Sequence, residues 1–203
     1  MAALAAAPFA EDQLSVIRRL LDGANPEQVQ WLQGYLAGWH AAKSPQAAPA
    51  APPAVRTPLT ILYGTESGNA EALAGAARKV AQRLGFAART LDMADATPEQ
   101  VAASENLLVI ASTWGEGDPP QRAEALHAGL LADNAPRFDG VRYAVLALGD
   151  RAYAKFCETG RVFDDRLAAL GGVRAAERVE CDLDYETQAK AWIDASLRAL
   201  EPE

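Results

Sequence analysis

The sequence has few cysteines, no excess of positive charge and no long apolar run. Two cysteines among 203 residues, Cys157 and Cys181, make no disulfide scaffold and lack the spacing of a metal site. The net charge of −8 argues against a nucleic-acid partner, because a phosphate backbone requires basic contacts. No apolar run approaches the roughly 20 residues that span a bilayer, so no membrane contact is expected. Residues 1–10 contain no Lys or Arg, unlike a secretory signal, and a reducing, cytoplasmic location is the simplest.

Basic residues are also missing from the turn around which the chain is organised. Leu59–Tyr63 is an apolar run typical of a buried parallel strand, and residues 70–84 have helical spacing. Between them lies the turn 65–69 (TESGN), and no Lys or Arg occurs between Arg56 and Arg78. Because a triphosphate loop ends in Gly-Lys-Ser/Thr and a dinucleotide fingerprint opens with Gly-x-Gly, both are excluded. The pattern favours a site for one phosphate monoester, held by N–H groups and hydroxyls; an ordinary capped turn is the alternative.

Downstream of this turn, strand-like and helical patterns alternate. The further predicted strands are Phe86–Leu91, Asn106–Ala111, Val141–Leu148 and Val173–Cys181. The further predicted helices are a short one opening at Thr97, then Arg122–Leu131, Phe156–Leu170 and Glu186–Leu200. This alternation predicts an α/β fold, a doubly wound parallel sheet with helices on both faces. Ligands of such sheets bind beyond the carboxyl ends of the strands.

Residues 11–41 read as two short helices, with Asn25 as the N-cap of the second and Pro26 at its first position. An apolar stripe runs along the second helix through Val29, Leu32, Leu36 and Trp39. Because so short a pair buries little surface alone, the stripe is expected to pack on another copy, on the main domain or on a partner subunit. A loosely held appendage is the alternative.

The predicted domain boundaries follow from a Pro/Ala-rich stretch. Residues 43–56 form a flexible linker. A helical segment, residues 1–42, precedes this linker and is expected to serve assembly or partner docking. A folded domain, residues 57–203, follows it.

Two later loops place aromatic residues beside glycine and acidic residues. Ser112–Pro120 (STWGEGDPP) follows the most apolar predicted strand, and Leu148–Cys157 (LGDRAYAKFC) follows the next one. Trp114 and Tyr153 could sandwich a flat ring, since aromatic faces stack favourably. Gly115 and Gly117, in the loop 112–120, let the backbone approach such a ring. A tryptophan buried in the core is the alternative for Trp114.

Together, the segments GTESGNA (64–70), STWGEGDPP (112–120) and LGDRAYAKFC (148–157) resemble the three FMN-binding loops of flavodoxin-like domains. They are most similar to the FMN domain of the diflavin reductases, and among these to the flavoprotein (alpha) subunit of NADPH-dependent assimilatory sulfite reductase. The resemblance implies a flavodoxin-like, five-stranded parallel sheet of order 2-1-3-4-5, with FMN as the cofactor. The N-terminal helical pair resembles the assembly segment of the same subunit.

The resemblance also implies a role for each residue that matches a motif. It assigns the FMN phosphate to Thr65, Ser67, Gly68, Asn69 and Ala70, with Glu66 contributing its backbone. It assigns the flavin ring to Ser112, Thr113, Trp114, Gly115 and Gly117 on one side and to Tyr153 on the other. The pocket around the ring is assigned to Leu148, Gly149, Asp150, Phe156 and Cys157. Asp182 and Asp184 match an acidic turn near the exposed flavin edge, and no residue is expected to be catalytic or to bind a metal.

The implied function is FMN-dependent electron transfer from an FAD- and NADPH-binding reductase domain to a metal-containing acceptor, first of all the sulfite reductase haemoprotein. FAD and NADPH are expected only in a parent or partner module, so this chain is not expected to oxidise NADPH by itself. Self-association through residues 11–41 is a further expected contact. The FMN domain of another diflavin reductase or a stand-alone flavodoxin is the alternative within this class, and a non-redox protein-binding module is the alternative outside it.

Overall fold

The computed structural model describes residues 9–43 and 56–201. The chain divides into two compact units, Met1–Ala54 and Val55–Glu203. The predicted linker, residues 43–56, lies outside the described residues except at its two ends. The first unit contains the two expected helices, α1 (Glu11–Asp22) and α2 (Pro26–Lys43).

A capping box fixes the start of α2. The N–H of Gln28 donates to Asn25 Oδ1, and the N–H of Asn25 donates to Gln28 Oε1, both at 2.9 Å. Asn25 is therefore the N-cap, as predicted. Exposed large apolar side chains are frequent in this unit: Val16, Leu20, Leu21, Trp31, Tyr35, Leu36 and Trp39. Within the described parts of the chain, no helix combines the length and the apolar character needed to cross a membrane.

The second unit is built on a parallel sheet of order β2-β1-β3-β4-β5, which is the predicted order. Its strands are β1 (Pro58–Gly64), β2 (Ala87–Asp92), β3 (Asn106–Ser112), β4 (Arg142–Leu148), β5 (Val173–Arg174) and β6 (Val179–Cys181). β3 and β4 are paired on both sides and almost completely buried, which explains their continuous apolar sequences. All pairings in this sheet are parallel, so the carboxyl ends of the strands share one edge.

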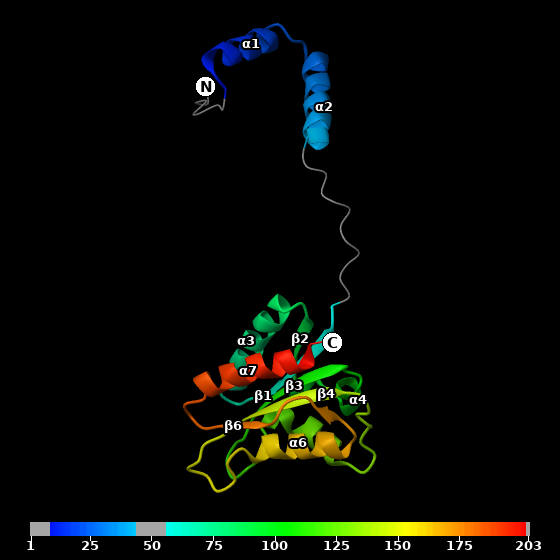
Figure 1. Ribbon diagram of the computed structural model, residues 1–203, viewed down its shortest axis with the longest axis vertical. Helices are drawn as coiled ribbons and strands as arrows, with labels where there is room; N and C mark the ends of the chain where they lie inside the picture. The colour runs from blue at the N-terminus through cyan, green and yellow to red at the C-terminus, as the bar shows by residue number, and fades with distance from the viewer. Residues whose placement is uncertain (1–8, 44–55, 202–203) are drawn as a thin grey trace. The chain divides into compact units, whose positions relative to one another are not determined.

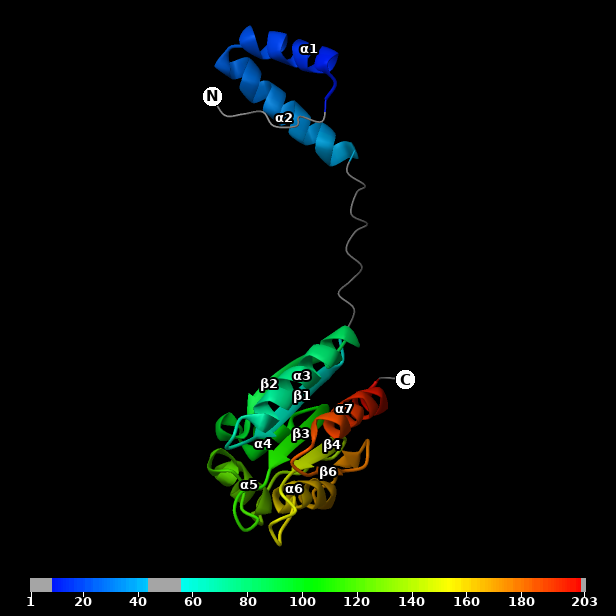
Figure 2. The same ribbon diagram turned by 90° about the vertical axis from the view of Figure 1, so that its left-hand side faces the viewer.

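Helices cover both faces of this sheet (Figure 1). α3 (Asn69–Arg83) and α7 (Glu186–Leu200) pack on one face, where alanines of α3 meet Ile61 and Leu108. α4 (Pro98–Ala102), α5 (Glu124–Leu131) and α6 (Glu158–Ala169) pack on the other face, around Val109 and Val145. Figure 2 shows the sheet between these two groups of helices. The predicted doubly wound α/β fold is therefore confirmed.

The predicted strand Val173–Cys181 is wrong in one respect, because the structure divides it into β5 and β6, which both pair with β4. The cause lies in two arginines and a buried carboxylate of α6. Arg174 Nε lies 2.9 Å from Asp164 Oδ1, and Arg178 Nη1 lies 2.5 Å from Asp164 Oδ2. These ion pairs connect Arg174 and Arg178 to α6, and the strand ladder is interrupted between these two arginines.

His127 of α5 makes the stability of this unit sensitive to pH. Its ring contacts Phe163 of α6 edge-on, with centroids 5.6 Å apart, and burial lowers its pKa from 6.5. The unfolded chain then binds a proton more readily than the folded one, so stability is complete above the unfolded pKa of about 6.5 and falls as pH decreases below it. We expect His127→Gln to reduce the loss of urea midpoint between neutral and mildly acidic pH. An identical loss in both proteins would contradict this assignment.

Candidate functional site

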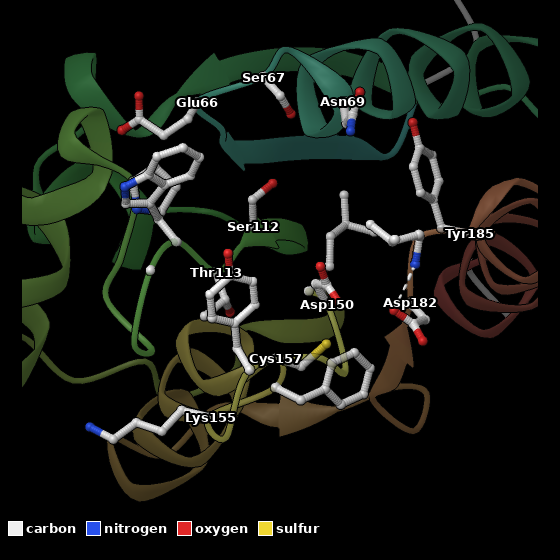
Figure 3. Close-up of a pocket in the computed structure, with 18 residues that line it drawn as sticks. Glu66, Ser67, Asn69, Ser112, Thr113, Asp150, Lys155, Cys157, Asp182 and Tyr185 are labelled. Atoms are coloured by element: carbon white, nitrogen blue, oxygen red, sulfur yellow. Dashed lines mark hydrogen bonds between the residues drawn. The ribbon is translucent and has the colours of Figure 1, made fainter.

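A cavity of about 420 Å³ opens at the carboxyl edge of the sheet (Figure 3). Loops that follow β1, β3, β4 and β6 line it. Its volume is within the range of small-molecule sites, roughly 300–1,000 Å³. The predicted site residues that line it are Glu66, Ser67, Asn69, Ser112, Thr113, Trp114, Gly115, Leu148, Gly149, Asp150, Tyr153, Phe156, Cys157 and Asp182. The predicted residues Thr65, Gly68, Ala70 and Gly117 lie outside the lining.

The first turn presents unpaired N–H groups at one end of the cavity. Gly68 has a φ of +86°, which favours glycine, and its N–H donates to Thr65 Oγ1 at 3.0 Å. Thr65 therefore closes the turn, and α3 begins immediately after it. The N–H groups of residues 69–71 donate to no other residue that the structure describes. With the side chains of Ser67 and Asn69 beside them, they form an uncharged set of donors for an anion.

The charged side chains of the lining add no basic donor to the first turn. The Glu66 carboxylate accepts a hydrogen bond from the N–H of Gln121, at 2.5 Å, and so connects the first turn to η2 (Gln121–Ala123). Lys155 is the one basic residue of the lining. Figure 3 shows its ammonium pointing away from Ser67 and Asn69. The donor set at the first turn is thus uncharged, as its sequence indicates.

The second loop is a closed turn that presents Trp114. The N–H of Trp114 donates to the carbonyl of Asp118 at 2.8 Å, and the N–H of Asp118 donates back at 2.9 Å. Gly117 between them has a φ of +110°, and a β-carbon there would lie 2.5 Å from Lys155 Cδ. Trp114 is 61% exposed, so it is not the core tryptophan of the alternative interpretation. A large exposed indole at the rim of a cavity is typical of a ligand site.

The third loop presents Tyr153. The Asp150 carboxylate accepts a hydrogen bond from the N–H of Ala152 at 2.8 Å, and the Tyr153 N–H donates to the Asp150 carbonyl at 3.1 Å. This local turn leaves the Tyr153 side chain 48% exposed. Gly149 at the start of the loop lies against the backbone of Cys157, where a β-carbon would approach its nitrogen to 2.8 Å. Both aromatic residues singled out in the sequence therefore reach the same cavity.

Cys157 and Cys181 are buried and unpaired, and neither is suited to nucleophilic chemistry. Burial raises the pKa of Cys157 to about 12, with a smaller contribution from Glu180, and burial also raises the pKa of Cys181. Both thiols are therefore protonated at neutral pH. Cys157 has a left-handed backbone, with φ +58°, so α6 begins after it at Glu158 and not at Phe156 as predicted. The thiol donates weakly to the Ala147 carbonyl at 3.4 Å.

Residues of the loop after β6 were largely missed in the sequence. Leu183 and Tyr185 of this loop line the cavity. Pro120 of the second loop and Lys155 of the third loop also line it and were not predicted. The Asp182 carboxylate, which was predicted, accepts hydrogen bonds from the N–H groups of Leu183 at 2.9 Å and Arg151 at 3.2 Å. It therefore joins the third loop to this fourth one. The rule that ligands bind at the carboxyl edge applies equally to the last strand and identifies this loop.

Comparison with known proteins agrees with this geometry. The sulfite reductase [NADPH] flavoprotein alpha-component of Bacillus subtilis (strain 168) is 42% identical over 201 residues, which is 95% of this chain and 33% of that protein. The corresponding protein of Cronobacter sakazakii is 39% identical over 189 residues, which is 91% of this chain and 31% of that protein. The chain thus spans about a third of the length of these curated relatives.

Solved structures agree on the fold. A cysteine-to-serine variant of flavodoxin from Pseudomonas aeruginosa superposes with a TM-score of 0.63 at 27% identity, covering 71% of this chain and 99% of that one. The flavodoxin of Streptococcus pneumoniae TIGR4 has a TM-score of 0.64 at 21% identity and covers 70% of this chain and 97% of its own. The Flavodoxin family profile matches residues 61–192, which is more than half of the sequence. The chain therefore belongs to the flavodoxin family, an electron-transfer family whose cofactor is FMN.

Proposed function

We propose that residues 57–203 hold FMN in this cavity and relay electrons from an FAD- and NADPH-binding reductase module to a metal-containing acceptor. The sulfite reductase haemoprotein is the first candidate for that acceptor. One observation carries the proposal: a single cavity has uncharged donors at one end and two exposed aromatic side chains, Trp114 and Tyr153, among its other lining residues.

The residues present fit FMN. The N–H groups of residues 69–71, with Ser67 and Asn69, would hold the phosphate. The absence of a basic side chain from this turn suits one phosphate monoester better than a polyphosphate with magnesium, which requires a lysine there. Trp114 and Tyr153 would cover the faces of the ring, and the cavity volume is adequate for a ligand of this size.

Bound FMN supplies one- and two-electron redox chemistry. The residues of the chain hold the ring, keep water from its faces and leave it within reach of another protein. Trp114 and Tyr153 are 61% and 48% exposed, so a ring held between them is accessible to a docked partner. The protonated thiol of Cys157 adds no competing nucleophile to the cavity.

The relatives support the larger assignment. The curated relatives described above are named sulfite reductase flavoprotein alpha-components, and this chain matches 33% of the length of the Bacillus subtilis protein. We assign the FAD- and NADPH-binding module to the part of such a protein that lies beyond the matched third, or to a separate reductase. The NADPH-dependent activity of the relatives would then require both parts.

The absorbance of the purified protein tests the cofactor, and a haemoprotein tests the acceptor. We expect visible flavin absorbance, release of FMN on denaturation and stoichiometric uptake of FMN by the apoprotein. A colourless protein that takes up no FMN would refute the first step. Reduced protein mixed with the sulfite reductase haemoprotein should then reduce its haem, with an equal concentration of reduced free FMN as the control.

Acidic residues near the cavity make this electron transfer dependent on salt. Glu116 and Asp184 are exposed on loops at the carboxyl edge of the sheet. A basic partner would be attracted to such an edge, and ions screen the attraction over roughly 10 Å at 0.1 M salt. We expect the haem reduction rate to fall as ionic strength rises, and Glu116→Gln with Asp184→Asn to reduce that dependence. Glu105→Gln is the matched control, because Glu105 is exposed just before β3, at the opposite edge of the sheet. A haem reduction rate that does not change with ionic strength would contradict the docking site.

A further inference from the structure

Thr159 lies outside the cavity lining and is 1% exposed, yet it contacts the second loop in two ways. Its N–H donates to the Thr113 side-chain oxygen at 3.2 Å. Its own hydroxyl donates to the Asp118 carbonyl at 3.1 Å. The two hydrogen bonds connect residues that are 46 and 41 positions apart in the sequence, and they run to opposite ends of the turn that carries Trp114.

The first of these bonds is a helix cap supplied by another loop. Cys157, the N-cap of α6, makes no capping hydrogen bond through its side chain. Thr159 is the second residue of α6, and its N–H is one of the donors that a helix leaves without an internal partner. Thr113 accepts that N–H, as an N-cap side chain normally does. The start of α6 is therefore complete only when the second loop is in place.

Packing of the same two loops adds a third contact. The Lys155 stem occupies the space beside Gly117, where a β-carbon would lie 2.5 Å from Cδ and 2.7 Å from Cβ of the lysine. Trp114 is the first residue of the closed turn in the second loop, and Tyr153 belongs to the third loop. The Thr113 N–H also donates to the Leu148 carbonyl at 2.9 Å, so the start of the second loop is hydrogen-bonded to the end of β4.

We propose that Thr113 and Thr159, the threonine pair, are positioning residues that join the second and third loops into one unit and set the spacing between Trp114 and Tyr153. The inference rests on the proposed binding of FMN but assigns a function to a residue that does not contact the cavity. The hydrogen bonds of this unit join protein groups only, so no ligand is needed to complete them. FMN then enters a preformed space and does not have to order two separate loops.

The test compares variants that keep or remove each hydroxyl. Thr159→Val removes the bond to Asp118 and leaves its carbonyl without that donor, and we expect the Kd for FMN to rise about tenfold. Thr159→Ser keeps the hydroxyl and should stay within about twofold of the original protein. Thr187→Val is the matched control, because Thr187 is likewise the second residue of its helix, α7, and is exposed. It should leave the Kd unchanged.

Amide hydrogen exchange on the apoprotein provides a readout that does not depend on FMN. Exchange at Trp114 and Asp118 should be faster in Thr159→Val and in Thr113→Val, and it should return to its original rate in Thr113→Ser. In the double variant Thr113→Val/Thr159→Val, the increase in Kd should be smaller than the product of the two single increases, because both bonds hold one loop.

The outcomes separate this inference from the proposed function. If the original protein binds no FMN but the variants still accelerate exchange in the second loop, the proposed function fails and the joined loops remain. If Thr159→Val binds FMN as tightly as the original protein, with unchanged exchange, the threonine pair does not position the loops. A lower melting temperature with an unchanged Kd would also overturn the proposal, because it would indicate a purely structural role. Should Thr159→Val not fold, hydrogen exchange of Thr113→Val decides the question, because Thr113 itself lines the cavity and its Kd alone would not separate the two roles.

Discussion

Gly160→Ala is expected to lower the free energy of unfolding of the FMN domain by about 2–3 kcal/mol, the upper part of the range for an overfilled core. Gly160 is a buried residue of α6, and a β-carbon there would lie 2.3 Å from Ala147 Cβ and 2.9 Å from Ala147 Cα. Ala147 belongs to β4 at the centre of the sheet. Neither atom is at the end of a flexible side chain, so the helix must move away from the sheet to make room. That movement would also displace Thr159 and the third loop.

Gly75→Ala is the matched control for this prediction. Gly75 lies inside α3, and a β-carbon there would have no atom within 4 Å. The same substitution should therefore stabilise the protein by roughly 0.5–1 kcal/mol, because alanine loses less conformational freedom in a helix than glycine. Urea unfolding of both variants followed by circular dichroism measures the two effects. Equal stability of Gly160→Ala and the original protein would mean that α6 does not pack this closely on β4.

The elements that sequence reasoning located well are those whose signal is local. β3 has six buried residues in succession, and its apolar run indicates its position in the sequence. α4 begins with a capping box, in which the Thr97 hydroxyl accepts a hydrogen bond from the N–H of Gln100. The four consecutive residues Thr97–Gln100 are enough to predict it. α7 has the predicted bounds, Glu186–Leu200. In each case the residues that determine the element lie within it or next to it.

Features that depend on distant residues could not be predicted in this way. The interruption between β5 and β6 depends on Asp164, which comes 10 and 14 positions before its partners Arg174 and Arg178. The start of α6 depends on a hydroxyl from Thr113, 46 positions earlier. Neither arginine nor threonine has a local pattern that reveals such a contact. Only the folded chain shows that these polar residues have partners.

The candidate site divides along the same line. Three of its four loops were found from their sequences, because each follows a buried strand and carries glycine with a hydroxyl or an aromatic residue. Within those loops, Thr65 and Gly117 hold the backbone and lie outside the cavity lining. A resemblance between motifs identifies the loop but does not distinguish a residue that faces the ligand from one that shapes the loop. That distinction requires the hydrogen bonds.

Trp114→Ala is expected to raise the Kd for FMN roughly thirtyfold, which corresponds to about 2 kcal/mol. Trp114 is 61% exposed, so stacking on a ring would remove much of that surface from water. The loss combines this burial with the stacking term of about 0.5–1.5 kcal/mol for an aromatic pair. Trp114→Tyr keeps an aromatic face and should lose much less. Quenching of flavin fluorescence during titration of the apoprotein measures each Kd.

Riboflavin, which has the ring but lacks the phosphate, makes the position of Trp114 testable. If Trp114 contacts the ring alone, Trp114→Ala should raise the Kd for FMN and the Kd for riboflavin by the same factor. Ser67→Ala should instead weaken the binding of FMN and leave that of riboflavin unchanged, because its hydroxyl belongs to the donor set proposed for the phosphate, beside Asn69. Trp31→Ala, which removes an exposed tryptophan of α2, controls for the loss of an indole and should change neither Kd. If Trp114→Ala binds both ligands normally, Trp114 does not cover the ring, and the assignment of the cavity to a flavin loses one of its two aromatic contacts.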